Sequence, residues 1–134
     1  MAKFNLRVLT PKREVFVGEV DSITAPGFDG DFGVLSGHYA YITSVKPGAL
    51  SFSAGGTNHL FAVGSGFAQV TAERVSLVLS ACEDAASIDL ATAKKSLAAA
   101  EEALLSATPG ETAYTDAIFD QQMALGRLQA AERR

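Results

Sequence analysis

Glycine and alanine are distributed unevenly along the chain, and this division limits what the chain can fold into. Ten of the 12 glycines lie in residues 1–66, whereas 14 alanines lie in residues 85–134. Glycine marks turns, and alanine is the strongest helix former. We therefore expect two structural parts, the first with many turns and the second helical.

The first part has the pattern of short β-strands. Residues 3–9 alternate apolar and polar side chains, which is the period of two typical of a half-buried strand. Turn residues recur too often for the helical crossovers that parallel sheets need. This predicts an N-terminal antiparallel β-sandwich of about ten short strands, with the last strand before Cys82, a turn at 27–31 and a hairpin turn at 64–66. The expected strands cover residues 3–9, 15–17, 20–23, 32–35, 39–45, 50–53, 60–63, 67–70 and 75–79.

From Ile88 the apolar period changes to that of a helix. Apolar and small residues then recur at spacings of 3 and 4, which places them on one helix face. Ser87 or Asp89 is the expected N-cap, Thr108-Pro109-Gly110 breaks the helix, and Thr112 is the expected cap of a second helix that runs to about Arg133. This predicts a C-terminal antiparallel two-helix hairpin. Its seam comprises Leu90, Ala93, Leu97, Ala100 and Leu104 on one helix and Tyr114, Ala117, Gln121, Ala124, Leu128 and Ala131 on the other, widened by Ile118 and Leu125.

The predicted helical hairpin is expected to be only weakly held. Alanine side chains bury little apolar area, which limits the hydrophobic stabilisation. Gln121 in the seam and Gly126 near its end weaken the packing further, since glycine inside a helix costs about 1 kcal/mol relative to alanine. We therefore expect residues 1–86 to form a docking domain and residues 87–134 a mobile regulatory domain.

Several classes of function are excluded by composition and motifs. A net charge of −4 argues against nucleic-acid binding. No apolar run approaches the ~20 residues of a membrane helix, the N-terminus has no signal-like apolar block, and the single cysteine excludes an internal disulfide. No phosphate loop, HExxH motif, zinc-type cysteine pair or nucleophile elbow occurs, and neither His38 nor His59 has a metal-ligand neighbourhood. We expect no catalytic and no metal site.

Three groups of polar residues remain as candidates for partner contacts. Asp29 and Asp31 flank Gly30, where aspartate suits a turn but also offers an acidic loop to a basic partner. His38 lies in a polar loop, where it satisfies local backbone groups or contacts a partner. Three arginines at the end of the chain suit a helix C-terminus or dock on an acidic partner: Arg127, Arg133 and Arg134. The residues alone do not decide, for any of the three groups, between a local structural role and a contact with a partner.

Several segments together resemble the epsilon subunit of the F-type ATP synthase, which is called delta in mitochondria. The strongest is Gly-Asp-Phe-Gly-Val-Leu-Ser-Gly-His at 30–38, followed at the family's spacing by Ile42-Thr43 and Lys46-Pro47-Gly48. Residues 64–70, Gly-Ser-Gly-Phe-Ala-Gln-Val, are similar to the family's next block, and Ile88-Asp89 to the start of its helical part. The resemblance covers essentially the whole chain.

The resemblance implies a noncatalytic subunit, not an enzyme, in the rotor's central stalk. In the family, the β-sandwich binds the gamma subunit and rests on the polar loops of the c-ring, which couples proton-driven rotation to ATP synthesis. The hairpin changes position, and its basic end meets the alpha and beta catalytic subunits and inhibits ATP hydrolysis. Carried over to this chain, the c-ring and gamma contacts are Asp29, Asp31, His38, Tyr39 and Ile42, and the inhibitory contacts are Arg127, Arg133 and Arg134.

The sequence departs from the resemblance where some members bind ATP. Those members carry arginine at the position of Thr92 and again at that of Met123. Two missing guanidinium groups remove natural phosphate partners, so we expect weak or no ATP binding and no cofactor. The implied location is peripheral, on the cytoplasmic face of a bacterial plasma membrane, with the thylakoid and mitochondrial inner membranes as alternatives. The competing hypothesis is a free-standing β-sandwich module that binds a ligand in an apolar pocket and self-associates through its hairpin.

Overall fold

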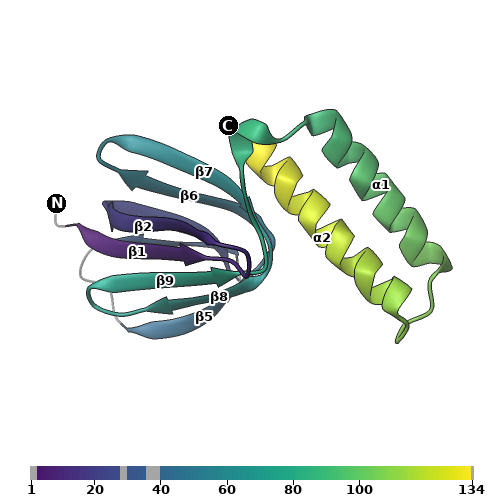
Figure 1. The fold of residues 1–134 in the computed structure, drawn as a ribbon, viewed down its shortest axis with the longest axis horizontal. Coiled ribbons are helices and arrows are strands. Elements are labelled where there is room, and N and C mark those ends of the chain that lie inside the picture. Colours follow the sequence, from purple (N-terminus) through teal and green to yellow (C-terminus); the bar gives the residue numbers. More distant parts are fainter. Residues whose placement is uncertain (1–2, 28–29, 36–39, 134) are drawn as a thin grey trace.

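The fold consists of ten strands followed by two helices (Figure 1), in a computed structural model that describes residues 3–27, 30–35 and 40–133. After the strands come a single turn of 3-10 helix, Ala85–Ser87, and the helices α1, Leu90–Ser106, and α2, Thr112–Arg133. The strands are β1 Phe4–Leu9, β2 Glu14–Val20, β3 Ser22–Gly27, β4 Gly30–Leu35, β5 Tyr41–Val45, β6 Gly48–Ala54, β7 Thr57–Val63, β8 Gly66–Val70, β9 Arg74–Leu79 and β10 Cys82–Asp84.

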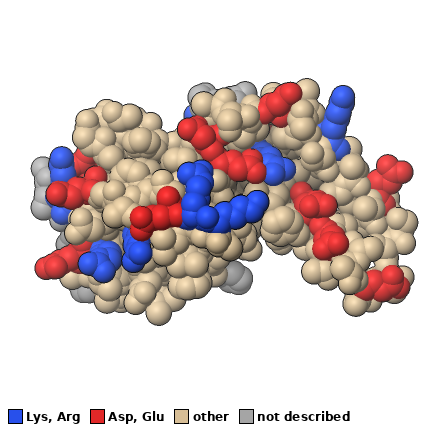
Figure 2. Space-filling model, in the orientation of Figure 1, with Lys and Arg blue, Asp and Glu red and all other residues tan. Residues whose placement is uncertain are grey.

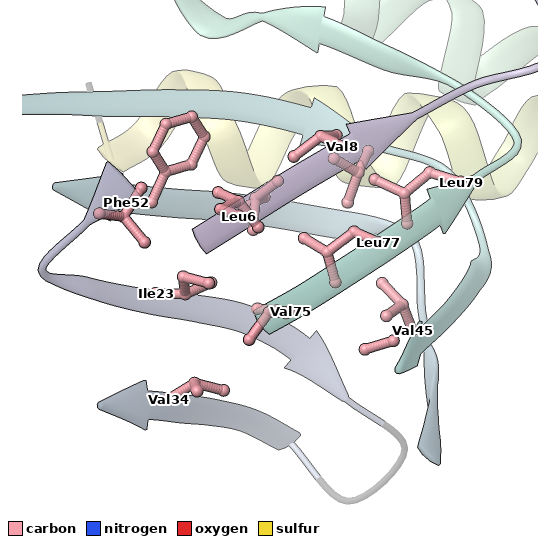
Figure 3. Packing of buried hydrophobic residues seen from close by; sticks show 14 of the residues in the cluster. Leu6, Val8, Ile23, Val34, Val45, Phe52, Val75, Leu77 and Leu79 are labelled. Atoms are coloured by element: carbon pink, nitrogen blue, oxygen red, sulfur yellow. The ribbon is translucent and has the colours of Figure 1, made fainter. Parts of the chain in front are cut away.

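The strands form a two-layered sandwich. Their order is β10-β7-β6-β3-β5-β8-β9-β1-β2, with β4 paired to β3. The layer β5-β8-β9-β1-β2 and the layer β10-β7-β6-β3-β4 are joined by a single pair, Gly27 with Val45. Side chains from both layers meet between them, among them Leu6, Ile23 and Leu77, which are at most 2% exposed (Figure 3). The predicted sandwich and hairpin are confirmed.

Alternation along the strands explains this core. In β1 every second residue, Phe4, Leu6 and Val8, is buried, while Asn5 and Arg7 are exposed. Full burial of one such apolar side chain contributes roughly 1.5–3 kcal/mol. A register slip by one residue would therefore turn this whole set toward solvent.

The strand pairing differs from the expectation in three places. β1 pairs with β9 in parallel, and the seven strands between them in the chain take the place of the crossover helix that usually joins two parallel strands. A tenth strand begins at Cys82 and pairs with the end of β7. Residues 64–66 form no hairpin, since β7 and β8 pair with different neighbours and the chain passes here between layers. Glycine is required at 66, because a Cβ atom would collide with the Val78 carbonyl oxygen.

The helical hairpin begins and turns close to where the sequence predicts. Asp89 caps α1, its side chain accepting hydrogen bonds from the backbone N–H groups of Ala91 and Thr92. Gly110 in the connection has a φ of +95°, a conformation that favours glycine. α2 starts at Thr112 itself, so Thr112 is its first helical residue and not its cap. The two helices then run antiparallel (Figure 1).

α2 also packs against the outer face of β6 and β7, which the predicted seam did not anticipate. The contact joins small residues: Ala49 and Ala62 from the sheet and Ala130 from α2, all at most 1% exposed. Gly126 is buried there, because a Cβ atom on it would lie 3.1 Å from both the Gly48 nitrogen and the Val63 oxygen. Gly126 therefore allows close approach to the sheet. Two predicted seam residues are wrong, since Leu90 and Leu125 are 37% and 44% exposed.

Within the described residues, no helix has the length and apolar character needed to cross a membrane.

Candidate functional site

Arg127 and Glu83 form a two-pronged ion pair that ties α2 to the edge of the sandwich. Arg127 Nε donates to Glu83 Oε2 at 2.9 Å, and Nη2 donates to Oε1 at 2.7 Å. Glu83 is the middle residue of β10, at the edge of the sheet, and Arg127 is one turn before Ala130 on α2. The two side chains are 37% and 32% exposed. The planar guanidinium matches the carboxylate, which makes this geometry stronger and more directional than a single contact.

The ion pair shifts the titration of both partners. Hydrogen bonds from Arg127 lower the pKa of Glu83 below its ordinary value of 4.5, against the opposing effect of partial burial. In return, the hydrogen bonds to Glu83 raise the pKa of Arg127. Both groups are therefore charged at neutral pH, and the pair persists until Glu83 is protonated.

A second ion pair joins the end of α2 to β4. Arg133 Nη1 lies 3.1 Å from Asp31 Oδ2, and the side chains are 47% and 39% exposed. Asp31 is the second residue of β4, opposite Pro26 of β3, so it lies in a strand and not in the expected turn. Arg133 is the last residue of α2, so the helix spans the layer from β10 to β4.

These pairs join residues that the sequence analysis assigned to separate surfaces. Asp31 was expected to face the c-ring, and Arg127 and Arg133 the catalytic subunits; here all three hold the hairpin on the sandwich. Glu83 was missed. It lies 44 residues before Arg127, in a strand too short to show periodicity, so no local pattern marked it.

The predicted c-ring and gamma residues do not gather at one place. Ile42 is 71% exposed on β5, in the layer opposite to that of Asp31. The outer face of this second layer carries further exposed apolar side chains, Phe67 on β8 at 47% and Val17 on β2 at 59%. Phe67 pairs with Val78, which in turn pairs with Leu9, so half-buried apolar side chains extend this face from Phe67 toward β2, where Val17 lies opposite the exposed Arg7. Asp29, His38, Tyr39 and Arg134 lie outside the described residues.

The alternation of β8 already implied that Phe67 faces outward. Its neighbour Ala68 and Val70, two residues further on, are buried in the core, so Phe67 and Gln69 must point to the other side. In the sequence this segment is marked only by its resemblance to the family, and no motif points to the exposed ring of Phe67. We define the apolar face as Leu9, Val17, Ile42, Phe67 and Val78.

A hollow of about 220 Å³ is lined in part by Thr92, one of the two positions where the resemblance implies arginine in ATP-binding members; Met123, the other position, is not in its lining. The Thr92 hydroxyl donates to Asp89 at 3.0 Å, and Met123 is 3% exposed. The cation at the hollow, Arg127, is held by Glu83. The hollow therefore offers two carboxylates, Glu83 and Asp89, and a single guanidinium group that is already paired, which does not suit a triphosphate. That the chain binds ATP weakly or not at all stays a prediction. The lining comprises Glu83, Ser87, Ile88, Asp89, Thr92, Ala93, Ser96 and Arg127.

Cys82 does not supply a nucleophile in the described structure. It is 9% exposed at the start of β10. Burial raises the pKa of its thiol to about 12, so the reactive thiolate is scarce at neutral pH. Among the described residues, no three His, Cys, Asp or Glu side chains are grouped so that they could hold a metal ion.

Comparison with known proteins gives concordant matches. The family model described as "ATP synthase, Delta/Epsilon chain, beta-sandwich domain" matches residues 3–85. ATP synthase epsilon chain 1 of Syntrophotalea carbinolica is 37% identical over 131 residues, covering 98% of this chain and 95% of the relative. The ATP synthase epsilon chain of Thermodesulfovibrio yellowstonii is 41% identical over 110 residues, covering 82% of this chain and 79% of the relative.

The fold is also found in a solved structure. A chain of the Euglena gracilis mitochondrial ATP synthase, in a structure of OSCP, F1 and c-ring, superposes with a TM-score of 0.80 at 22% identity, covering 100% of this chain and 83% of that one. This likeness concerns the fold alone, whereas the bacterial relatives match in sequence along both the sandwich and the hairpin. On that evidence, the chain belongs to the ATP synthase epsilon-chain family.

Proposed function

We propose that this chain is a noncatalytic rotor subunit of the central stalk in a proton-translocating F-type ATP synthase. It couples rotation of the c-ring to ATP synthesis through the gamma subunit. The observation that carries this proposal is the relationship to an ATP synthase epsilon chain over 98% of the chain, sandwich and hairpin together. The implied location is peripheral, on the cytoplasmic face of a bacterial plasma membrane, through these partners.

The apolar face is the proposed docking surface for gamma. Its most exposed members, Ile42, Val17 and Phe67, would lose between about half and three quarters of their surface to a partner. Exposed apolar side chains that are neighbours on one sheet face are typical of protein interfaces. The proposed contact with the basic side of a c-ring loop falls on Asp31, together with Asp29, His38 and Tyr39. An exposed ion pair there would orient the subunit more than bind it.

The hairpin is the proposed regulatory arm. Its arginines would reach acidic segments of the alpha and beta subunits only after leaving their present partners, Glu83 and Asp31. The described arrangement therefore corresponds to the arm held on the sandwich. In the proposed inhibitory arrangement the arm is extended and Arg127, Arg133 and Arg134 contact the catalytic subunits.

A reconstitution experiment tests the proposed function. The full chain and a truncated chain of residues 1–86 are each mixed with tagged gamma subunit and c-ring, and the captured protein is quantified. Both chains are expected to be retained, since the apolar face and Asp31 lie within residues 1–86. If the full chain is not retained and instead self-associates, the ligand-binding alternative replaces this proposal. If only the truncated chain fails, the division into a docking part and an arm is wrong.

A further inference from the structure

Asp31 is the point where the end of the arm meets the part of the sandwich proposed to face the c-ring. Its Oδ2 is 3.1 Å from Arg133 Nη1, in the last turn of α2. Although paired, the Asp31 side chain keeps 39% of its surface exposed. A second cation can therefore approach the same carboxylate from solvent.

Arg133 has no alternative carboxylate in the hollow that it borders. This hollow, of about 350 Å³, lies on the outer face of β3, β6 and β7. Its described lining is otherwise hydroxyl, amide, imidazole and apolar groups: Ser22, Thr24, Ser51, Phe52, Ser53, Asn58, His59 and Leu60. An Arg133 displaced from Asp31 would thus lose its charge partner instead of exchanging it for another one in this hollow.

We propose that Asp31 is a shared anchor, held by Arg133 within the chain and open to competition by a basic loop of the partner. Binding of that loop then weakens the docking of α2, and docking of α2 weakens the loop contact by the same factor, because coupling between two binding events is reciprocal. The inference rests on the proposed function, since it needs a cationic partner at Asp31. It adds a direct link between contact at the base of the stalk and release of the arm.

The expected size of the coupling between loop binding and α2 docking follows from how exposed the Asp31–Arg133 ion pair is. Both side chains are between about two fifths and one half exposed, so water screens the pair strongly. Pairs of this kind change an equilibrium by about two- to fivefold. The second ion pair, Arg127 with Glu83, is left intact, so competition at Asp31 shifts the balance between docked and undocked hairpin without abolishing docking.

The link within the chain is tested by measuring the docked fraction of the hairpin in solution. Nitroxide spin labels are attached to cysteines introduced at Thr57, in the sandwich, and at Glu102, on α1, in a Cys82→Ala background. Double electron–electron resonance then measures the distance between the two labels. Asp31→Asn and Arg133→Gln are each expected to raise the undocked fraction about two- to fivefold. The exchanged pair Asp31→Lys with Arg133→Glu restores docking, and Asp21→Asn, which removes a carboxylate that forms no ion pair with any described residue, changes nothing. Equal undocked fractions in all variants overturn the proposal.

The link to the partner is tested with the assembled gamma subunit and c-ring as the probe. Addition to the labelled chain is expected to raise the undocked fraction, and addition to the Asp31→Asn chain to raise it much less. If the gamma and c-ring assembly binds and raises the undocked fraction equally in the labelled chain and in its Asp31→Asn variant, the shared anchor is overturned and the proposed function stands. Absence of any binding overturns both.

Discussion

The two ion pairs of α2 differ in strength because they differ in geometry. Arg127 meets Glu83 with two parallel hydrogen bonds, whereas Arg133 meets Asp31 through a single contact. The first pair is also the less exposed of the two. At the scale of single residues, Glu83 is therefore the main electrostatic hold on the hairpin.

Replacing Glu83 with glutamine is expected to loosen the hairpin. The change keeps the shape of the side chain but removes its charge and leaves Arg127 without a carboxylate partner. Because both side chains are about a third exposed, we expect a loss of about 1 kcal/mol in the free energy of unfolding. Urea titration followed by circular dichroism measures it. Glu101→Gln, at an exposed position on α1, is the matched control, and equal stability of the Glu83 and Glu101 variants would contradict this role.

The same pair predicts a dependence of stability on pH. The pKa of Glu83 is lowered in the folded chain from the ordinary 4.5, so its contribution is fully present above 4.5 and is lost as pH falls through the lowered value. The stability difference between the wild type and Glu83→Gln should be present at neutral pH and vanish under strongly acidic conditions. A difference that is constant with pH would rule out an electrostatic origin.

Residues were predictable where a pattern or a resemblance marked them, and their partners were not. Asp31, Arg127 and Arg133 are predicted to contact partner subunits, and these contacts stay predictions. What pairs with them in the described structure depends on how α2 lies across β10, β7, β6 and β4, which no local spacing contains. Glu83 is one carboxylate among 15 acidic residues in the sequence and has no feature that distinguishes it.

At the scale of elements, the contact of α2 with β6 and β7 depends on small residues. Gly126 is unfavourable for an isolated helix, but a Cβ atom at this position would lie only 3.1 Å from backbone atoms of Gly48 and Val63. Ala130, Ala49 and Ala62 continue the contact. The prediction that Gly126 weakens the hairpin considered only helix propensity and seam packing, whereas the close approach to the sheet provides a compensating reason for glycine.

A larger side chain at position 126 should separate α2 from the sheet. In Gly126→Leu the new Cβ meets backbone atoms of the paired sheet residues Gly48 and Val63 at 3.1 Å, and the sheet backbone cannot yield as a flexible side chain does. We expect a loss of about 1–3 kcal/mol in the free energy of unfolding, although leucine favours helix. Gln122→Leu, at an exposed position of the same helix, serves as the control and should not destabilise the chain. A Gly126→Leu chain as stable as the wild type would refute the close contact.

The apolar face should matter for binding and not for folding. Ile42→Ser and Phe67→Ser replace side chains that are 71% and 47% exposed, so the free energy of unfolding should change little. Affinity for the gamma subunit should fall roughly tenfold for each. Leu105→Ser, at an 89% exposed position on α1, is the control for loss of surface hydrophobicity. Binding isotherms that are unchanged in both face variants would move the gamma interface elsewhere.

Element type and order followed from periodicity, while pairing did not. Long alternating or helical patterns gave the sandwich and both helices, and Asp89 and Gly110 marked helix ends correctly. β10 was missed because three residues show no period. The parallel pairing of β1 with β9 and the passage between layers at 64–66 depend on how the layers close, which is a property of the tertiary structure.

At the scale of the whole molecule, charge is distributed unevenly along the hairpin. Figure 2 shows acidic side chains toward the free end of the hairpin, and acidic and basic side chains interspersed over the rest of this face. The acidic residues of the connection and its neighbouring turns include Glu102, Glu111 and Asp116, whereas the described arginines of α2 lie toward the sandwich. In the proposed extended arrangement, Arg127 and Arg133 would leave the carboxylates of Glu83 and Asp31 and pair with carboxylates of a partner subunit.

The most direct test of the movable arm is the rate of ATP hydrolysis by the assembled complex. Three forms of the chain are compared with the wild type: Glu83→Gln, which loosens the arm; Glu83→Cys with Arg127→Cys joined by a short reducible cross-linker, which locks it; and residues 1–86, which lack it. We expect slower hydrolysis with the loosened arm, faster hydrolysis with the locked or absent arm, and a return toward slow hydrolysis when the cross-link is reduced. The same rate in all forms, with each chain shown to be bound in the complex, would contradict it.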